Sequence, residues 1–283
     1  MFEAKKVSKN GKSITLDSGL ELTYCEFGEE HEEIVLSGAF YFHTFTPVLE
    51  ELAKRYHVYG VVMRMSGPAT EFDKDGSINW TRQWGEDLYQ FCKAMNIKKF
   101  HYVGKCHGTN PGWFMIKEHP EMLETFTSFY LAPHLCKRNS ELWREIPQKE
   151  GPVEFMRRCM RKQENLPIKF AEMRTLGPEF ASSETTENKA NIGKYAESPQ
   201  LVWSSPEECE EGLKNVHTPV MFVFGTDDIL FHDYFDSNIK AMEIVPGART
   251  VLLQGERHLM EMDCPDRMAS EVFFFIDESK KKY

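Results

Sequence analysis

The sequence predicts an α/β domain in which helices cover both faces of a mostly parallel sheet, with a helical segment inserted into it. Apolar runs of strand length alternate with helical patterns from residue 34 to about residue 131, which is typical of a parallel sheet. From about Pro133 to Pro206 the pattern is charged and helical, and the strands resume at Pro219. We therefore expect a first core part at residues 1–132, a helical cap at 133–206 and a second core part at 207–283.

Short apolar runs bounded by turn residues predict the strands. In chain order these runs are residues 12–16, 20–27, 34–36, 57–63, 100–103, 126–131, 219–224 and 250–253. Apolar residues at helical spacing, as in Trp84, Leu88 and Phe91, predict the helices. These segments are residues 47–55, 80–95, 111–119, 237–243 and 266–276 in the core, and 141–145, 153–163 and 168–175 in the cap.

Composition limits the partners that we expect. The 283 residues include 34 basic and 44 acidic side chains, a net charge of -10 that argues against nucleic acid or an anionic membrane as a partner. No apolar run reaches the roughly 18 residues of a membrane span. We expect a small-molecule substrate, and the oligomeric state stays open.

The cysteines and the start of the chain indicate a compartment. Seven cysteines without paired short spacing favour a reducing cytoplasm over a disulfide framework or a zinc site. The first residues, Met1-Phe-Glu-Ala-Lys-Lys-Val7, lack the apolar core of a signal peptide. We therefore expect a cytoplasmic protein, and we assign it no metal and no cofactor.

One cysteine lies at the centre of a strand–turn–helix unit. The strand at residues 100–103 ends at Gly104, Gly108 follows Cys106 at the matching distance, and Pro111 opens a helix. This arrangement predicts a nucleophile elbow, in which the central residue has a strained backbone and its neighbours pack too closely for a Cβ. The pentapeptide alone is a weak signal, because a buried cysteine is usually a small core hydrophobe.

An acid and a base follow the cysteine in the order that such a site needs. Asp228 lies just past a strand and His258 lies in the loop after the next one, so the order is nucleophile, acid, base. Asp227 is a rival acid. His107 is a rival base, although we expect the side chain next to the nucleophile to point away from it.

The loop after the strand at residues 34–36 is a candidate for one half of an oxyanion hole. We expect Gly38 to turn the chain sharply and to aim the amide of Ala39 at the elbow, where the amide of His107 supplies the second donor. The alternative is an ordinary strand-to-helix loop.

Together these motifs resemble those of the α/β-hydrolase superfamily, in its capped members. The matching motifs are Leu36-Ser-Gly-Ala39, Gly104-Lys-Cys-His-Gly108, Gly225-Thr-Asp-Asp228, and Arg257-His258 with Asp263 and Pro265, and the resemblance covers nearly the whole chain. Ser37 stands where the family usually has histidine, and Arg257 where it usually has glycine. The cysteine nucleophile is similar to that of dienelactone hydrolases and polyhydroxyalkanoate synthases.

The resemblance implies a triad of Cys106, His258 and Asp228 that forms a thioester acyl-enzyme. We expect hydrolysis of an ester, lactone or thioester of a small apolar acid. Two alternatives stay open: an acyltransferase that passes the acyl group to an amine, alcohol or thiol, and a non-catalytic binding protein in which Cys106 is a buried or redox-sensing thiol.

Overall fold

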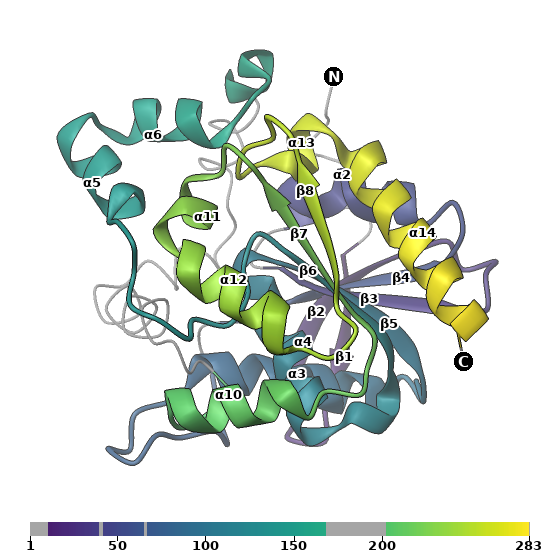
Figure 1. Cartoon of the computed structure of the whole chain (residues 1–283). Coiled ribbons are helices and arrows are strands. Elements are labelled where there is room, and N and C mark those ends of the chain that lie inside the picture. Colours follow the sequence, from purple (N-terminus) through teal and green to yellow (C-terminus); the bar gives the residue numbers. More distant parts are fainter. Residues whose placement is uncertain (1–10, 40–41, 65–66, 168–201, 283) are drawn as a thin grey trace.

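A computed structural model describes residues 11–39, 42–64, 67–167 and 202–282, and its centre is an eight-stranded sheet (Figure 1). The strands are β1 (Gly11–Thr15), β2 (Glu21–Phe27), β3 (Ile34–Ala39), β4 (His57–Val62), β5 (Phe100–Lys105), β6 (Leu123–Phe129), β7 (Val220–Gly225) and β8 (Arg249–Leu253). Their order is β1-β2-β4-β3-β5-β6-β7-β8. The β1–β2 and β2–β4 pairs are antiparallel, and all other pairs are parallel. The carboxyl ends of β3 to β8 therefore meet at one edge, where ligand sites of such sheets form.

Helices cover both faces of this sheet, as predicted (Figure 1). They are α2 (Phe42–Leu52), α3 (Trp80–Ala94), α4 (Thr109–Glu118), α5 (Leu142–Lys149), α6 (Pro152–Cys159), α10 (Pro206–Lys214), α11 (Ile229–Asp233), α12 (Phe235–Ile244), α13 (Met260–Asp263) and α14 (Pro265–Lys282). Short 3-10 turns are η1 (Cys106–Gly108), η2 (Pro120–Met122) and η3 (Gln163–Asn165).

Successive strand residues pack into two separate hydrophobic clusters, because side chains leave a strand alternately to its two faces. Tyr102 of β5 and Phe222 of β7 belong to a cluster with α3, α4, α10 and α12. The next residues along the same strands, Val103 and Val223, belong to a second cluster with α2 and α14. The sheet thus lies between two cores.

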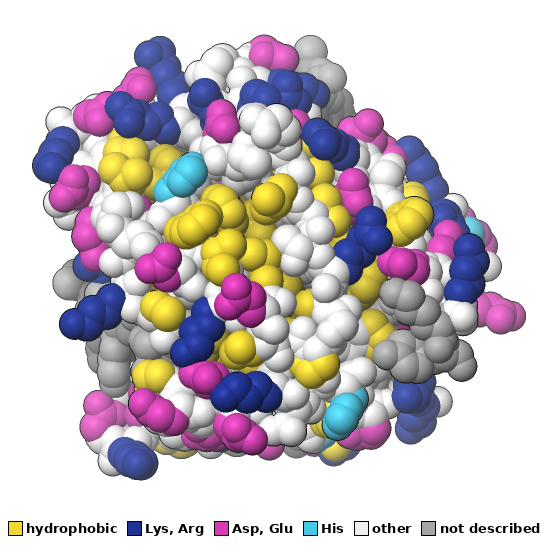
Figure 2. Space-filling model, viewed as in Figure 1, with side chains coloured by type: hydrophobic (Ala, Val, Ile, Leu, Met, Phe, Trp, Pro, Cys, Tyr) yellow, Lys and Arg dark blue, Asp and Glu magenta, His cyan; other side chains and the backbone are white. Residues whose placement is uncertain are grey.

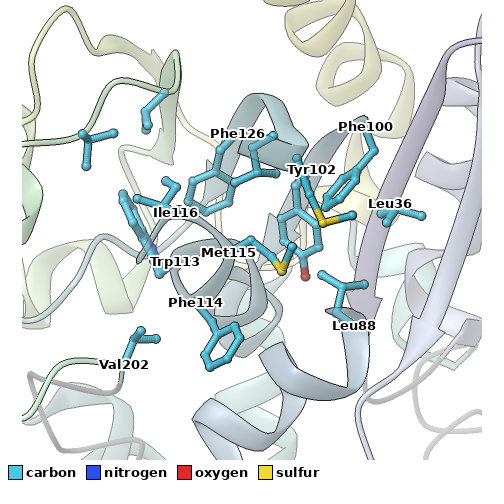
Figure 3. Packing of buried hydrophobic residues seen from close by; sticks show 14 of the residues in the cluster. Leu36, Leu88, Phe100, Tyr102, Trp113, Phe114, Met115, Ile116, Phe126 and Val202 are labelled. Carbon is cyan, nitrogen blue, oxygen red and sulfur yellow. The ribbon is translucent and has the colours of Figure 1, made fainter. Parts of the chain in front are cut away.

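Residues 109–116 of helix α4 are all buried, and its apolar side chains belong to the first cluster. Figure 3 shows Trp113, Phe114, Met115 and Ile116 spread around this helix, and all four are at most 8% exposed. A helix that is apolar all round is stable only when it is enclosed. Its packing therefore holds the residues at its first turn, directly after Cys106, in a fixed place.

Several predicted boundaries are wrong for identifiable reasons. Helix α2 begins at Phe42, so Pro47 lies inside it and does not start it. Strand β6 begins at Leu123, because Glu124 and Thr125 interrupt the apolar run without interrupting the strand. Helix α10 was not predicted.

An insertion separates β6 from β7 and carries α5, α6 and η3. The helices predicted at residues 141–145 and 153–163 correspond to α5 and α6, and the one predicted at 168–175 lies outside the described residues. Two buried carboxylates of the core bind this insertion. Asp233 accepts hydrogen bonds from the amides of Leu142 and Trp143 (3.0 and 2.9 Å), and Asp263 accepts them from those of Arg161 and Lys162 (2.6 and 2.9 Å).

The surface mixes both charges. Figure 2 shows Lys and Arg among Asp and Glu around the edge of one face, while hydrophobic side chains gather near its middle, over the region where Figure 1 places α11 and α12. None of the helices in the described ranges has the length and hydrophobicity of a membrane span.

Candidate active site

The turn between β5 and α4 has the backbone of a nucleophile elbow. Cys106 has a φ of 50°, in the left-handed region that non-glycine residues rarely adopt. A Cβ on Gly104 would lie 2.6 Å from the carbonyl oxygen of Gly108, and a Cβ on Gly108 would lie 2.2 Å from that of Gly38. The predicted need for glycine on both sides of Cys106 is confirmed. The second contact also brings the end of β3 against the elbow.

Tyr102 connects the end of β3 to the elbow. Its hydroxyl accepts a hydrogen bond from the amide of Gly38 (3.0 Å) and donates one to the carbonyl of Gly108 (2.7 Å). A Cβ on Gly38 would lie 2.7 Å from this hydroxyl. The predicted sharp turn at Gly38 is wrong, since β3 continues to Ala39; glycine is needed there because Tyr102 lies so close. Ser37, in the position usually held by histidine, donates to the carbonyl of Val103 (2.6 Å) and fastens β3 to β5.

Asp228 and His258 form a buried pair. Asp228 caps α11, where it accepts a hydrogen bond from the amide of Leu230 (2.8 Å), and its carboxylate lies 3.0 Å from Nδ1 of His258. Their exposed fractions are 0% and 4%. Burial opposes the charged imidazole, but the charge of Asp228 and its hydrogen bond outweigh it and, with Cys106, raise the pKa of His258 to about 10. Asp227, the rival acid, is exposed.

The thiol of Cys106 interacts with two imidazoles. Nδ1 of His107 lies 3.4 Å from Sγ, so the expectation that this side chain points away is wrong. Burial alone would raise the pKa of the thiol. The charge of His107 and a hydrogen bond with it, followed by a hydrogen bond with His258 and its charge, lower that pKa to about 5. In turn the thiolate raises the pKa of His107, against the effect of burial. Both shifts favour a thiolate beside imidazolium at the elbow.

Aromatic rings enclose the imidazole of His258. The ring of Tyr130 lies 4.6 Å from it, and the ring of Trp143, from the inserted helix α5, lies 4.7 Å away at 69°. Tyr130 also donates a hydrogen bond (2.7 Å) to the buried carboxylate of Glu261, which pairs with Lys105. The sequence analysis missed this network, although Lys105 and Glu261 each lie within three residues of a predicted site residue.

A small pocket opens beside the thiol. Its cavity volume is about 20 Å³. It is lined by Cys106, His107, Thr109, Asn110, Trp113, Leu131, Ala132, Pro133, His134, Val202 and Trp203. The role of α4 in this wall could have been inferred from its position after the elbow. The role of His134 left no signal in the sequence. In the described ranges, no three His, Cys, Asp or Glu side chains are grouped as metal ligands.

Sheet order, strand directions and the elbow together define the α/β-hydrolase fold. No protein-family model matches the sequence, and no curated protein matches it. Solved structures do match, at low sequence identity. A membrane phospholipase A, described as a novel bacterial virulence factor, has a TM-score of 0.73 at 17% identity, over 99% of this chain and 91% of that one.

Two further similar structures are bacterial hydrolases. The meta-cleavage product hydrolase of Pseudomonas fluorescens IP01 has a TM-score of 0.72 at 17% identity, over 96% of this chain and 99% of its own. The enol-lactonase of Burkholderia xenovorans LB400 has a TM-score of 0.66 at 17% identity, over 94% of this chain and 100% of its own. The chain thus has the α/β-hydrolase fold.

Proposed function

We propose that this protein is a hydrolase that cleaves an ester, lactone or thioester of a small, largely apolar acid through a cysteine acyl-enzyme. The observation that carries the proposal is the thiol of Cys106 on a strained elbow, where neighbouring imidazoles lower its pKa, together with a His258 imidazole that Asp228 orients at 3.0 Å. The names hydrolase and lactonase among structures of the same fold support this class of reaction. Others are named serine hydrolases, whereas this chain has cysteine at the elbow.

In the proposed reaction the thiolate of Cys106 attacks the acyl carbon. The carbonyl oxygen gains negative charge, and the amides of Ala39 and His107 bind it; losing one such donor typically costs about 10²–10³ in rate. In the structure the carbonyl of Gly38 lies against Gly108 of the elbow, and in a trans peptide the N–H of Ala39 points the opposite way, so this peptide must rotate before Ala39 donates to the oxyanion. The protonated His258 gives its proton to the leaving alcohol or thiol as the thioester forms.

The thioester is then hydrolysed by water. His258, now neutral, takes a proton from the attacking water, and Asp228 stabilises the imidazolium that results. The tetrahedral intermediate collapses, the acid leaves, and the thiolate–imidazolium pair is restored. Helices α5 and α6 act as a cap in this scheme, because Trp143 of α5 covers the imidazole of His258.

Intact-protein mass spectrometry with p-nitrophenyl acetate tests the proposal. We expect one acetyl adduct on the wild-type protein and none on Cys106→Ala. An equal adduct on both proteins would show that another residue is the nucleophile. Added amines or alcohols separate hydrolysis from acyl transfer, because a transferase yields the acylated acceptor in place of the free acid.

A further inference from the structure

The inner wall of the pocket carries buried polar nitrogens that have no hydrogen-bond partner in the described part of the chain. These atoms are Nδ2 of Asn110, Nε1 of Trp113 and both ring nitrogens of His134. The exposed fractions of Asn110, Trp113 and His134 are 3%, 2% and 3%. An unpaired buried polar group typically costs about 1–3 kcal/mol, and most such groups are paired in native structures. Several such groups on one wall therefore point to a ligand that pairs them.

The three side chains come from two elements that meet at the pocket. Asn110 and Trp113 are three residues apart on α4 and share a face of that helix. His134 follows β6, and its ring stacks on that of Tyr234 at 3.6 Å and 12°. All three line the same cavity as the thiol of Cys106. The three side chains therefore border the place where an acyl group bound to Cys106 would lie, and their nitrogens, which are closed off from solvent, become accessible only when these side chains shift toward a bound ligand.

This wall offers mainly hydrogen-bond donors, and the donors are uncharged. Burial, followed by the charges of Arg138 and His107, lowers the pKa of His134 to about 3, so its imidazole is neutral with one donor and one acceptor nitrogen. The amide of Asn110 and the indole of Trp113 add only donors at their unpaired nitrogens.

The lining favours an uncharged oxygen over a carboxylate. It includes no Lys, Arg, Asp or Glu among the described residues, and the charge of His107 is offset by the thiolate beside it. A buried carboxylate needs a cation or several strong donors, whereas a carbonyl oxygen needs only neutral donors such as these.

We propose that this wall binds a second carbonyl oxygen in the acyl part of the substrate, so that the protein prefers oxo-acyl groups over alkyl chains of the same length. Asn110, Trp113 and His134 are then the residues that set acyl specificity. The inference rests on the proposed function and adds the chemistry of the acyl group to it. A pure alkyl chain would leave the same donors unpaired, and sites built to bind a polar group reject analogues that lack it.

Two esters that differ in one group test the preference. In p-nitrophenyl 4-oxopentanoate a carbonyl replaces one methylene of p-nitrophenyl pentanoate. We expect the second-order rate constant for acylation of Cys106, followed by p-nitrophenolate release, to favour the oxo ester by about tenfold or more after correction for spontaneous hydrolysis. Equal rate constants would overturn the inference and leave the proposed function intact.

Variants assign the preference to the wall. Trp113→Phe keeps an aromatic ring but removes the N–H together with part of the indole ring, and His134→Phe removes both ring nitrogens; each should lower the oxo preference several-fold. Trp203→Phe is the matched control, because Trp203 lines the same pocket and its indole nitrogen is not among the unpaired atoms. The ratio is measured on one protein sample, so loss of folded protein cancels. An unchanged ratio in both Trp113→Phe and His134→Phe would refute the assignment.

Two further experiments test the inference. p-Nitrophenyl hydrogen succinate places a carboxylate where the oxo ester has its ketone, and faster acylation by this anion would overturn the choice of a neutral oxygen. If neither the oxo nor the alkyl ester acylates Cys106, the proposed function fails. In that case the affinities of 4-oxopentanamide and pentanamide for Cys106→Ala, measured by calorimetry, test the inference separately. Tighter binding of the oxo amide supports it, and equal or absent binding overturns it.

Discussion

At the scale of single residues, the thiol of Cys106 sets the expected pH dependence. A free cysteine thiol has a pKa of about 8.5, and here the two imidazoles lower it to about 5. The thiolate is the basic form, so a lowered pKa keeps it present down to acid pH. We predict that alkylation by iodoacetamide is nearly constant above about pH 6 and declines as the pH falls through about 5. An inflection near pH 8.5 would contradict the ion pair.

His107 and His258 should both lower the pKa of the thiol, but only His258 should be needed for turnover. His107→Ala should raise the pH at which alkylation of Cys106 declines, and it should retain turnover of an activated ester. His258→Ala should also raise it but should stop turnover, because only His258 is paired with a carboxylate. Peptide mapping after alkylation gives the site, and Cys136→Ser, which removes another partly exposed thiol, is the control. Full turnover in His258→Ala would make His107 the base.

Tyr102 is the residue on which the alignment of the elbow with β3 depends. Tyr102→Phe removes the acceptor for Gly38 and the donor to Gly108, so we predict a loss of about 1–3 kcal/mol of stability and slower acylation. Chemical denaturation and p-nitrophenyl acetate kinetics measure the two effects. Tyr56→Phe is the matched control: its buried hydroxyl has no partner in the described residues, so its removal should cost nothing. Equal losses in both variants would refute the bridging role.

At the scale of elements, the sequence predicted those whose hydrophobic pattern is regular. Helix α3 was found because Trp84, Leu88 and Phe91 form one buried stripe. Helix α10 was not predicted, although the sequence contains an N-cap signal for it. Ser205 accepts a hydrogen bond from the amide of Glu208, and Pro206 lies in the first turn. Its short apolar pattern, with only Cys209 and Leu213 buried, was the weak signal.

The candidate active site also combines features that the sequence predicts with features that it does not. The order nucleophile, acid, base of Cys106, Asp228 and His258 could be predicted, because each residue follows an apolar run that the sequence shows as a strand. The contact of His107 with the thiol depends on the left-handed backbone conformation of Cys106. The unpaired nitrogens of His134 depend on packing between segments that are far apart in the sequence. Neither leaves a periodic pattern in the sequence.

One buried carboxylate, among several contacts, fastens the end of α6 to the core. Asp263 accepts the amides of Arg161 and Lys162 just past the end of α6, so Asp263→Ala leaves both donors unpaired. We predict faster proteolysis of residues 150–167 and a loss of about 1–3 kcal/mol of stability. Asp266→Ala, on the exposed side of the next helix, is the matched control. Equal protease sensitivity in the two variants would show that the insertion is held by other contacts.

At the scale of the whole molecule, the insertion divides the core into two parts of the chain that must meet at the elbow. The partly buried pair of Lys105 and Glu261 joins them, since Lys105 ends β5 and Glu261 lies in α13, 156 residues later. The exposed fractions of their side chains are 16% and 0%. Breaking such a pair on one side leaves an uncompensated buried charge, which typically costs about 3–5 kcal/mol.

We therefore predict that Glu261→Gln lowers the free energy of unfolding by about 3–5 kcal/mol, because Lys105 loses its counter-ion. Adding Lys105→Met should recover most of that loss, since no unpaired cation remains. The exposed pair of Lys280 and Glu33 is the matched control: it also joins distant parts of the chain, but Glu33→Gln should have no measurable effect, because water screens both charges. A double-mutant cycle followed by urea denaturation measures the coupling. Additive losses in the double variant would mean that the two core parts are held together by hydrophobic packing alone.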